Sequence, residues 1–207
     1  MPTRVSPDFL DSVNEINYLD GRMGLPGIEG LRVLDIGAGC GRLARRMSET
    51  LPNLRQYDCI DGVAVSTFLG DYFASFRGLD KARVIPMTEH QSLLDAYDLC
   101  VNVHSWAECS LEATRWWLDR GAERQITWLP IVPNNPPELL TTELDGNQKP
   151  FIDDVINRGY ELVDDRRMVE NDEIREFDIH NKFYLFRRSQ DGRAVQPPGP
   201  HFAPVKV

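Results

Sequence analysis

The stretch Leu31–Arg42, "LRVLDIGAGCGR", decides the fold of this chain. Its first six residues, Leu31–Ile36, form a mainly apolar run that ends at a glycine, which is typical of a buried strand in a parallel sheet. Three glycines then follow at alternate positions, Gly37, Gly39 and Gly41. Glycine adopts positive φ angles and lets the backbone approach a ligand without a Cβ in between. The stretch therefore predicts a strand and a tight turn that holds a nucleotide-like ligand.

Strands and helices alternate on both sides of this turn. An amphipathic helix is expected over residues 8–20, and a long loop rich in Pro, Asn and Thr over residues 133–148. The expected strands cover residues 31–36, 55–61, 82–87, 97–103, 124–132, 160–168 and 181–188, and the expected helices cover residues 42–51, 68–79, 111–121 and 150–158. This alternation predicts an α/β fold with a doubly wound, seven-stranded, mostly parallel, Rossmann-like sheet and a short N-terminal helix. The last two strands are too close in sequence for a helix between them, so one of them is expected to run antiparallel.

The composition fits one globular domain. The chain has 207 residues, of which 42% are hydrophobic and 27% charged. We expect a single domain over residues 1–190, in which residues 1–28 form a cap helix and a turn, and a flexible Pro- and Gly-rich tail over residues 191–207. The net charge of −9 argues against a nucleic-acid partner, which needs a basic surface. No apolar stretch approaches the roughly 18 residues that span a bilayer, and the N-terminus is too polar for a secretory signal, so we expect no membrane partner and a cytoplasmic location.

Two acidic residues near the glycine turn indicate which ligand it holds. Asp61 ends the second strand, twenty residues after Gly41, where a carboxylate accepts hydrogen bonds from ribose hydroxyls. Asp35 lies just before the turn, where its charge repels a pyrophosphate and attracts a cation. The spacing G-x-G-x-G also differs from the G-x-G-x-x-G of dinucleotide-binding folds. S-adenosylmethionine carries a sulfonium and an ammonium group and no phosphate, so it is favoured over NAD; an NAD-linked oxidoreductase stays as an alternative.

The stretch Tyr97–Cys109, "YDLCVNVHSWAEC", carries the candidate catalytic groups. Residues just beyond the fourth strand face the ligand cleft, because the carboxyl ends of parallel strands open onto it. His104 lies there, and an imidazole with a pKa near 7 suits a general base that takes the proton of an attacking hydroxyl. Glu108 is expected to orient this imidazole, to hold the acceptor or, if a helix starts near Ser105, to form a capping box. The residues expected to contact the acceptor are Tyr18, His104, Ser105, Trp106 and Glu108.

The glycine turn and Asp61 resemble motif I and the ribose-binding acid of the class I S-adenosylmethionine-dependent methyltransferases, and the likeness extends over residues 31–188. The resemblance implies S-adenosyl-L-methionine as the cofactor and S-adenosyl-L-homocysteine as the product. It also implies that the segment after the third strand, Thr88–Gln91, holds the adenine. The residues expected to contact the cofactor are Asp35, Gly37, Ala38, Gly39, Gly41, Asp61, Gly62, Thr88, Glu89, His90, Asn102 and Val103.

Two further patterns narrow the resemblance. The pattern N-x-H-S-x-x-E over Asn102–Glu108, together with "YDCIDGVAVSTFLGDYF" over Tyr57–Phe73, is similar to the sugar O-methyltransferases of bacterial polysaccharide pathways. This resemblance implies a transferase that methylates a hydroxyl of a small sugar or an oligosaccharide precursor. The alternative from another class is a binding module that keeps the methyltransferase fold. A homodimer and a divalent metal stay open, since the acids and the four cysteines show no spacing that defines a metal site.

Overall fold

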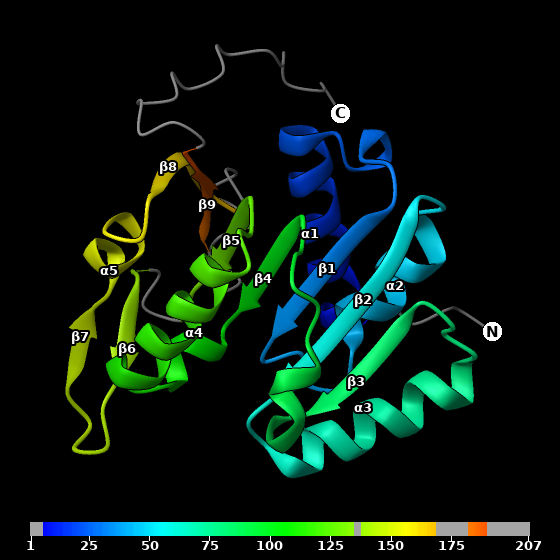
Figure 1. Ribbon diagram of the computed structural model, residues 1–207, viewed down its shortest axis with the longest axis horizontal. Coiled ribbons are helices and arrows are strands. Elements are labelled where there is room, and N and C mark those ends of the chain that lie inside the picture. The colour runs from blue at the N-terminus through cyan, green and yellow to red at the C-terminus, as the bar shows by residue number, and fades with distance from the viewer. Residues whose placement is uncertain (1–5, 135–137, 169–181, 190–207) are drawn as a thin grey trace.

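A seven-stranded sheet runs through the middle of the molecule (Figure 1). The computed structural model describes residues 6–134, 138–168 and 182–189, so the predicted tail over residues 191–207 lies outside the described residues. The strands follow one another across the sheet in the order β3-β2-β1-β4-β5-β9-β8. Their bounds are β1 (Leu31–Ile36), β2 (Leu54–Asp61), β3 (Ala82–Pro86), β4 (Leu99–Val103), β5 (Trp128–Val132), β8 (Tyr160–Arg167) and β9 (Lys182–Arg188).

The strand directions confirm the predicted mostly parallel sheet. The pairs β3–β2, β2–β1, β1–β4 and β4–β5 are all parallel. Among the described strands of this sheet, the antiparallel pairs are those of β9, with β5 on one side and β8 on the other. One of the last two strands is therefore reversed, as the sequence predicts. Because parallel strands end at the same edge, the loops after β1, β2 and β4 gather there.

Helices cover both faces of the sheet. The helices are α1 (Pro7–Met23), α2 (Arg42–Thr50), α3 (Ala64–Arg77), α4 (Leu111–Glu123) and α5 (Ile152–Ile156), and the 3-10 helices are η1 (Leu25–Gly27), η2 (Met87–Ser92) and η3 (Ser105–Glu108). Along β1, Leu31 and Val33 pack with residues of α1 and α2, whereas Leu34 and Ile36 pack with residues of α4 and α5. The helix α3 lies beside α2, where Arg77 bonds to Glu49 (3.0 Å). The sheet thus has a separate apolar core on each face, as a doubly wound fold requires.

The N-terminal helix α1 has cap residues at both ends. The hydroxyl of Ser6 accepts the backbone N–H of Phe9 (3.2 Å), and a proline occupies the first turn, where no intrahelical N–H bond is lost. Gly24 ends the helix with a φ of +63°. The predicted N-terminal helix is therefore confirmed and is a few residues longer than expected. In the described part of the chain, no helix combines the length and the apolar character needed to cross a membrane.

The loop predicted over residues 133–148 contains a hairpin instead. The strands β6 (Leu140–Thr142) and β7 (Gln148–Pro150) pair antiparallel and form a second, two-stranded sheet. The chain reverses through Asp145 and Gly146, and Gly146 has a φ of +82°. An Asp-Gly pair is a strong local signal for a hairpin turn. The polar composition of the whole segment indicates a loop instead, so the two signals conflict here.

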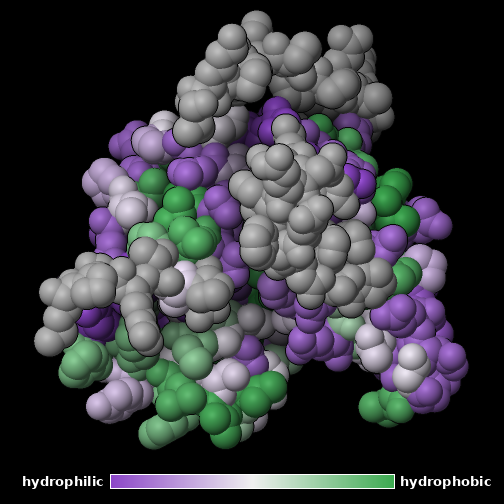
Figure 2. Space-filling view, turned by 180° about the vertical axis from the view of Figure 1, so that it is seen from behind, coloured by the Kyte–Doolittle hydropathy of each residue, from purple (hydrophilic) through white to green (hydrophobic). Residues whose placement is uncertain are grey.

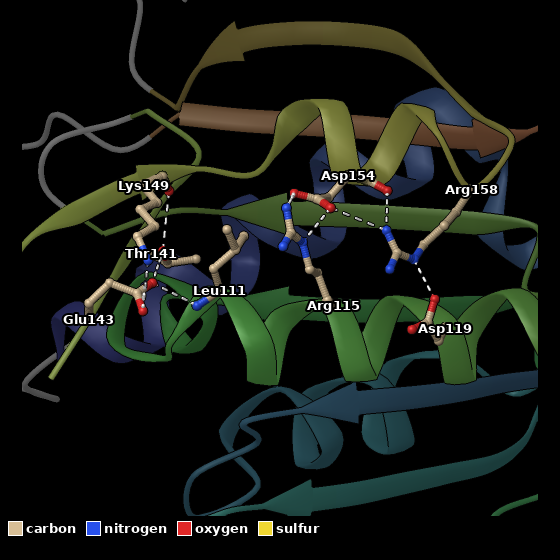
Figure 3. A network of polar contacts seen from close by, with 8 residues as sticks. All are labelled: Leu111, Arg115, Asp119, Thr141, Glu143, Lys149, Asp154 and Arg158. Carbon is tan, nitrogen blue, oxygen red and sulfur yellow. Dashed lines mark hydrogen bonds and ion pairs between the residues drawn. The ribbon is translucent and has the colours of Figure 1, made fainter.

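The hairpin, α4 and α5 are joined by the polar network that Figure 3 shows. Glu143 accepts the backbone N–H of Leu111 at the start of α4 (2.9 Å), and its other oxygen lies 3.4 Å from Nζ of Lys149. On the next turns of α4, Arg115 donates two hydrogen bonds to Asp154 of α5 (2.7 and 3.2 Å). These bonds hold the hairpin against α4. Its strand β6 also packs beside η3.

Candidate active site

The glycine turn after β1 is tied to the end of β2. Gly37 donates its backbone N–H to the carbonyl of Ile60 (2.7 Å), and Gly39 donates its own to Oδ2 of Asp61 (2.9 Å). The other carboxylate oxygen of Asp61 accepts the backbone N–H of Val63 (2.7 Å). Each carboxylate oxygen has a further lone pair. Asp61 therefore fixes the turn and keeps acceptor capacity for ribose hydroxyls.

The glycines of the turn meet different structural needs. Gly37, Gly39 and Gly41 have φ angles of +79°, +56° and +75°, a region that residues with a side chain rarely adopt. At Gly37 an added Cβ would lie 2.1 Å from the Cβ of Ser105, so only glycine allows η3 to pack against the turn. At Gly39 an added Cβ would meet no described atom within 4 Å. The space over Gly39 is therefore open to a ligand.

Asp35 lies beneath the turn and not on its surface. Its side chain is buried, and Oδ2 accepts the hydroxyl hydrogen of Tyr57 (2.8 Å). Burial raises the pKa of Asp35 to about 7, against the lowering effect of the Tyr57 hydrogen bond. The carboxylate is therefore engaged inside the free protein, and its direct contact with the cofactor stays a prediction. Asp35 acts on the turn through its charge, from a buried position.

Arg42, the first residue of α2, reaches toward α1. Its guanidinium donates to both carboxylate oxygens of Glu15 (2.9 and 3.1 Å) and to the hydroxyl of Ser12 (2.8 Å). Glu15 is only 2% exposed, and burial raises its pKa although Arg42 acts in the opposite direction. This buried ion pair attaches α1 to the start of α2, directly behind the glycine turn.

The charges around the turn fit a cationic ligand. Asp61 lies at its edge and Asp35 beneath it, while the positive charge of Arg42 is matched by Glu15. A pyrophosphate at this position would face the acidic side chains of Asp61 and Asp35, which is unfavourable. The residues present therefore fit a ligand that has a ribose, an ammonium group and a sulfonium group.

A buried polar cluster joins the end of β4 to the end of β1. The amide of Asn102 donates to the carbonyl of Ile36 (2.9 Å) and to Oγ of Ser105 (2.6 Å), and Ser105 donates to the same carbonyl (3.0 Å). Oδ1 of Asn102 accepts the backbone N–H of Trp106 (3.2 Å). The side chains of Asn102 and Ser105 are thus used inside the protein, and their predicted contacts with cofactor and acceptor are not what the structure shows. The predicted capping box is also wrong, because Ser105 lies inside η3 and its hydroxyl bonds to β1.

His104 lies between β4 and η3 in a constrained backbone conformation. Its φ is +66°, and its backbone N–H donates to the carbonyl of Val132 (2.7 Å). Such a conformation costs a residue other than glycine about 1–3 kcal/mol and is found mainly at functional sites. The side chain is half-buried. Burial lowers the pKa of His104 and Arg42 lowers it further, whereas Asp11 and Glu108 act in the opposite direction.

Glu108 lies at the rim of the same edge. It is the last residue of η3 and is exposed, and Nδ2 of Asn134 donates to its Oε1 (3.2 Å). After burial, Glu108 and Asp61 are the groups that raise the pKa of Cys109, so the ends of β2 and β4 converge here. Within residues 6–134, 138–168 and 182–189, no three His, Cys, Asp or Glu side chains are grouped as a metal site.

The segment predicted to hold the adenine follows β3 directly. The last residue of β3 pairs in register with Asp61, so η2 begins beside the predicted ribose acid. Thr88 and Glu89 are exposed there, and their contact with the adenine stays a prediction. The ring of His90 meets Trp116 of α4 edge-on, with 5.1 Å between the centroids, so His90 takes part in packing.

Three further predicted cofactor contacts lie at this edge. Ala38 is in the turn and donates its N–H to the carbonyl of Ile60 (3.3 Å). Gly62 follows β2 and is exposed, and Val103 ends β4 and is half-buried. The structure thus brings these residues to the end of the sheet where the glycine turn lies, and their contact with a cofactor stays a prediction.

Two residues that were predicted to contact the acceptor belong to the core. Trp106 is 1% exposed and packs edge-to-face on Phe151, with 6.0 Å between the centroids. Tyr18 is 9% exposed, stacks on Phe183 and donates its hydroxyl to Asp164 (2.9 Å). Burial and the charge of Asp164 raise the pKa of Tyr18, which makes it a poor proton acceptor. Both side chains are buried in the free protein, and their contact with an acceptor stays a prediction.

Two residues that support the glycine turn, Tyr57 and Glu15, were not predicted from the sequence. Tyr57 holds Asp35, and Glu15 holds Arg42. The spacing along α1 could have indicated the role of Glu15. This residue lies three positions after Ser12 and four before Leu19, on the buried side of the helix. A buried charge requires a partner of opposite charge.

No family model matches the chain. No curated protein matches it either. Its fold, however, is shared by solved structures. The cyclase SpnF has a TM-score of 0.62 and 15% identity, covering 89% of this chain and 84% of that chain. The mitomycin 7-O-methyltransferase MmcR has a TM-score of 0.62 and 14% identity, covering 87% of this chain but only 54% of that chain.

A third similar structure contains the cofactor. It is the magnesium protoporphyrin IX methyltransferase of Synechocystis PCC 6803 with bound S-adenosylmethionine, with a TM-score of 0.57 and 14% identity, covering 91% of this chain and 87% of that chain. The strand order and these likenesses together show that the chain has the fold of the class I S-adenosylmethionine-dependent methyltransferases. The acceptors of these structures differ, so the fold leaves the acceptor of this chain undefined.

Proposed function

We propose that this chain is an S-adenosylmethionine-dependent O-methyltransferase that methylates a hydroxyl of a sugar or an oligosaccharide precursor. The observation that carries the proposal is His104: a half-buried imidazole in a constrained backbone conformation, directly after β4, at the edge where the glycine turn and Asp61 lie. Backbone strain at such a position is typical of a functional group. S-adenosylmethionine supplies a methyl group bound to a positively charged sulfur.

The residues of the turn would hold the cofactor in three ways. Gly39 offers open space over the backbone, and Asp61 offers carboxylate lone pairs to the ribose. The buried charge of Asp35 favours a cation at the turn. Because these groups are already fixed by Tyr57, Val63 and the backbone of the turn, the site needs little rearrangement on binding.

His104 would act on the acceptor. The hydroxyl of a sugar must lose its proton as the oxygen attacks, and a nitrogen of the His104 ring accepts that proton. The lowered pKa of His104 keeps the ring neutral near pH 7, which is the form that accepts a proton. Glu108, held by Asn134 at the rim, would bind a further hydroxyl of the acceptor or orient the ring.

The proposal is tested by cofactor binding and by turnover. Calorimetric titration should show binding of S-adenosylmethionine and S-adenosylhomocysteine and none of NAD. Methyl transfer from labelled cofactor should then be detected with a saccharide acceptor and should disappear when the acceptor hydroxyl is blocked. Binding of NAD alone would favour an oxidoreductase. Binding of S-adenosylmethionine without methyl transfer to any hydroxyl would favour a binding module, or a different chemistry on the same fold, as the cyclase SpnF illustrates.

A further inference from the structure

The outer face of α3 is an unusually apolar surface. Six of its large hydrophobic residues are between 43% and 73% exposed, namely Val63, Val65, Phe68, Leu69, Tyr72 and Phe76. We call these six residues the α3 face. In the space-filling view of Figure 2, hydrophobic residues gather at the lower left of the molecule, where α3 lies. Between Val63 and Phe76 the only charged residue is Asp71. Soluble monomers rarely leave such a continuous apolar surface in water.

The size of the α3 face suits a protein interface. Its three aromatic side chains are 63–73% exposed; since an aromatic side chain presents 150–250 Å² when fully exposed, they alone offer roughly 300–500 Å². Val63, Val65 and Leu69 enlarge this area. A stable interface of standard size takes about 800 Å² from each partner. The α3 face together with the polar residues around it reaches that scale.

The three aromatic residues of the α3 face are spaced symmetrically about Tyr72. Phe68 and Phe76 lie four residues before and after Tyr72, and residues spaced by four share one side of a helix. In an antiparallel pair of α3 helices related by a two-fold axis at Tyr72, Phe68 lies opposite the partner's Phe76, and the two tyrosines meet on the axis. A two-fold interface requires this kind of self-complementary pattern. An unrelated partner does not.

We infer that the α3 face is the interface of a homodimer in which two copies of α3 pack antiparallel across a two-fold axis at Tyr72. The stacked arrangement of Tyr72 on Phe76, with 6.3 Å between the centroids, already presents the two rings as one surface. A membrane is a less suitable occupant, because the chain carries a net charge of −9 and anionic lipids would repel it. The dimer does not depend on the activity proposed above.

The first test is the mass of the chain in solution. Sedimentation velocity of the full chain should show a species of twice 23.6 kDa that dissociates on dilution. Tyr72→Arg places two positive charges on the axis and should weaken the dimer about thirtyfold or more, as loss of a central aromatic does. The matched control is Ile156→Arg on α5, an exposed residue on the opposite face of the sheet that should leave the dimer unchanged. Both residues are exposed, so circular dichroism should report an intact fold in each variant.

The second test identifies the axis. In a Cys40→Ser background, which removes an exposed thiol, Tyr72→Cys should form an intermolecular disulfide with itself under mild oxidation. Phe68→Cys should cross-link fast only when it is mixed with Phe76→Cys. A monomer at all concentrations would overturn the inference, and so would a dimer that Tyr72→Arg leaves intact. Binding of the monomer to vesicles of phosphatidylcholine and phosphatidylglycerol, lost in Tyr72→Arg, would overturn it in favour of a lipid surface.

Discussion

His104 is held by its neighbours in a conformation that most residues avoid. Its backbone N–H is fixed by Val132, and the following residue, Ser105, is fixed against β1 by its hydroxyl. The strain of about 1–3 kcal/mol is thus maintained by bonds on both sides. This arrangement places His104 at the edge of the sheet where the glycine turn lies.

The first prediction concerns His104→Ala. If the imidazole takes the acceptor proton, kcat should fall by about 10²–10⁴, the usual effect of one general base, while the Kd of the cofactor stays within about twofold. Steady-state kinetics and calorimetry measure the two quantities. An equal loss of cofactor binding would instead give His104 a structural role in the turn, and an unchanged kcat would exclude it as the base.

The pH profile gives a second test of the same residue. Because burial and Arg42 lower the pKa of His104, kcat should rise with pH through a pKa below 6.5 and stay level above it. Glu108 raises that pKa, so Glu108→Gln should move the rising limb to lower pH without abolishing it. A limb that stays in place in His104→Ala would belong to another group.

Asp35→Asn tests the buried charge beneath the turn. The pKa of Asp35 is raised to about 7 in the folded protein from an ordinary value of 3.8, so between these values the folded state binds more protons than the unfolded state. The stability of the free protein should therefore fall as pH rises from about 4 to 7, and a cationic cofactor should bind more tightly over the upper part of that range. Urea unfolding and calorimetry at several pH values should show both trends in the wild type. In Asp35→Asn the rise in cofactor affinity should disappear and the fall in stability should become smaller, with the raised pKa of Glu15 accounting for what is left.

At the scale of single residues, the sequence predicts the backbone better than the side chains. Gly37, Gly39 and Asp61 could be placed from their spacing, because a turn between a strand and a helix needs positive φ and an acid at the next strand. Trp106 and Asn102 could not, because sequence order does not show that η3 turns these groups inward. The same limit applies to Asp35, whose burial depends on Tyr57 of another strand.

Among the elements, α3 packs directly against the glycine turn. Gly70 is buried on its inner side, and a Cβ added there would lie 3.3 Å from the carbonyl oxygen of Gly39 and 3.6 Å from Cγ2 of Val84. The position of the turn therefore depends on the absence of one methyl group in α3. Leu69 and Tyr72 of the α3 face line one cavity together with Cys40 of the glycine turn, so the α3 face borders the turn.

Gly70→Ala should separate stability from binding. Alanine stabilises a helix by up to about 1 kcal/mol relative to glycine, but its Cβ should shift the turn by a few tenths of an ångström. The melting temperature should change little, while cofactor affinity falls about threefold to tenfold, the effect of weakening one hydrogen bond. Gly21→Ala in α1 is the matched control, since a Cβ there meets no described atom within 4 Å; it should leave affinity unchanged. Unchanged affinity in both variants would show that the turn adapts freely.

The order of the elements could be predicted almost completely, because apolar runs and helical spacing alternate along the chain. The hairpin β6–β7 could not, because each of its strands has three residues and its outer strand is fully exposed. Such short strands have no periodicity of their own. They form here because Glu143 and Thr142 bond to the backbone of α4 and η3.

In the whole molecule, the ion pair of Arg42 and Glu15 joins the N-terminal helix α1 to the start of α2. Arg42→Met leaves the carboxylate of Glu15 buried without a counter-ion and should cost about 3 kcal/mol of unfolding free energy. The double variant Arg42→Met/Glu15→Leu should recover most of that loss, since it removes both charges. Arg115→Met, which breaks an exposed ion pair with Asp154, is the control and should change stability little. Urea unfolding measures all three, and a double variant as unstable as the single one would contradict a buried-charge effect.

The glycine turn is held in place from three sides in the absence of a ligand: Asp61 bonds to Gly39, Ser105 fills the space beside Gly37, and Gly70 of α3 lies against the turn. A loop that is already ordered loses little entropy on binding. Little of the binding free energy from the adenosine and amino-acid ends of a ligand is therefore spent on ordering the loop. These ends are the same before and after the methyl group leaves. S-adenosylhomocysteine keeps both ends and should therefore compete with S-adenosylmethionine as a product inhibitor, although it lacks the positive charge on sulfur. Inhibition by S-adenosylhomocysteine at concentrations close to the Kd of S-adenosylmethionine would be the kinetic sign that the glycine turn is ordered before binding.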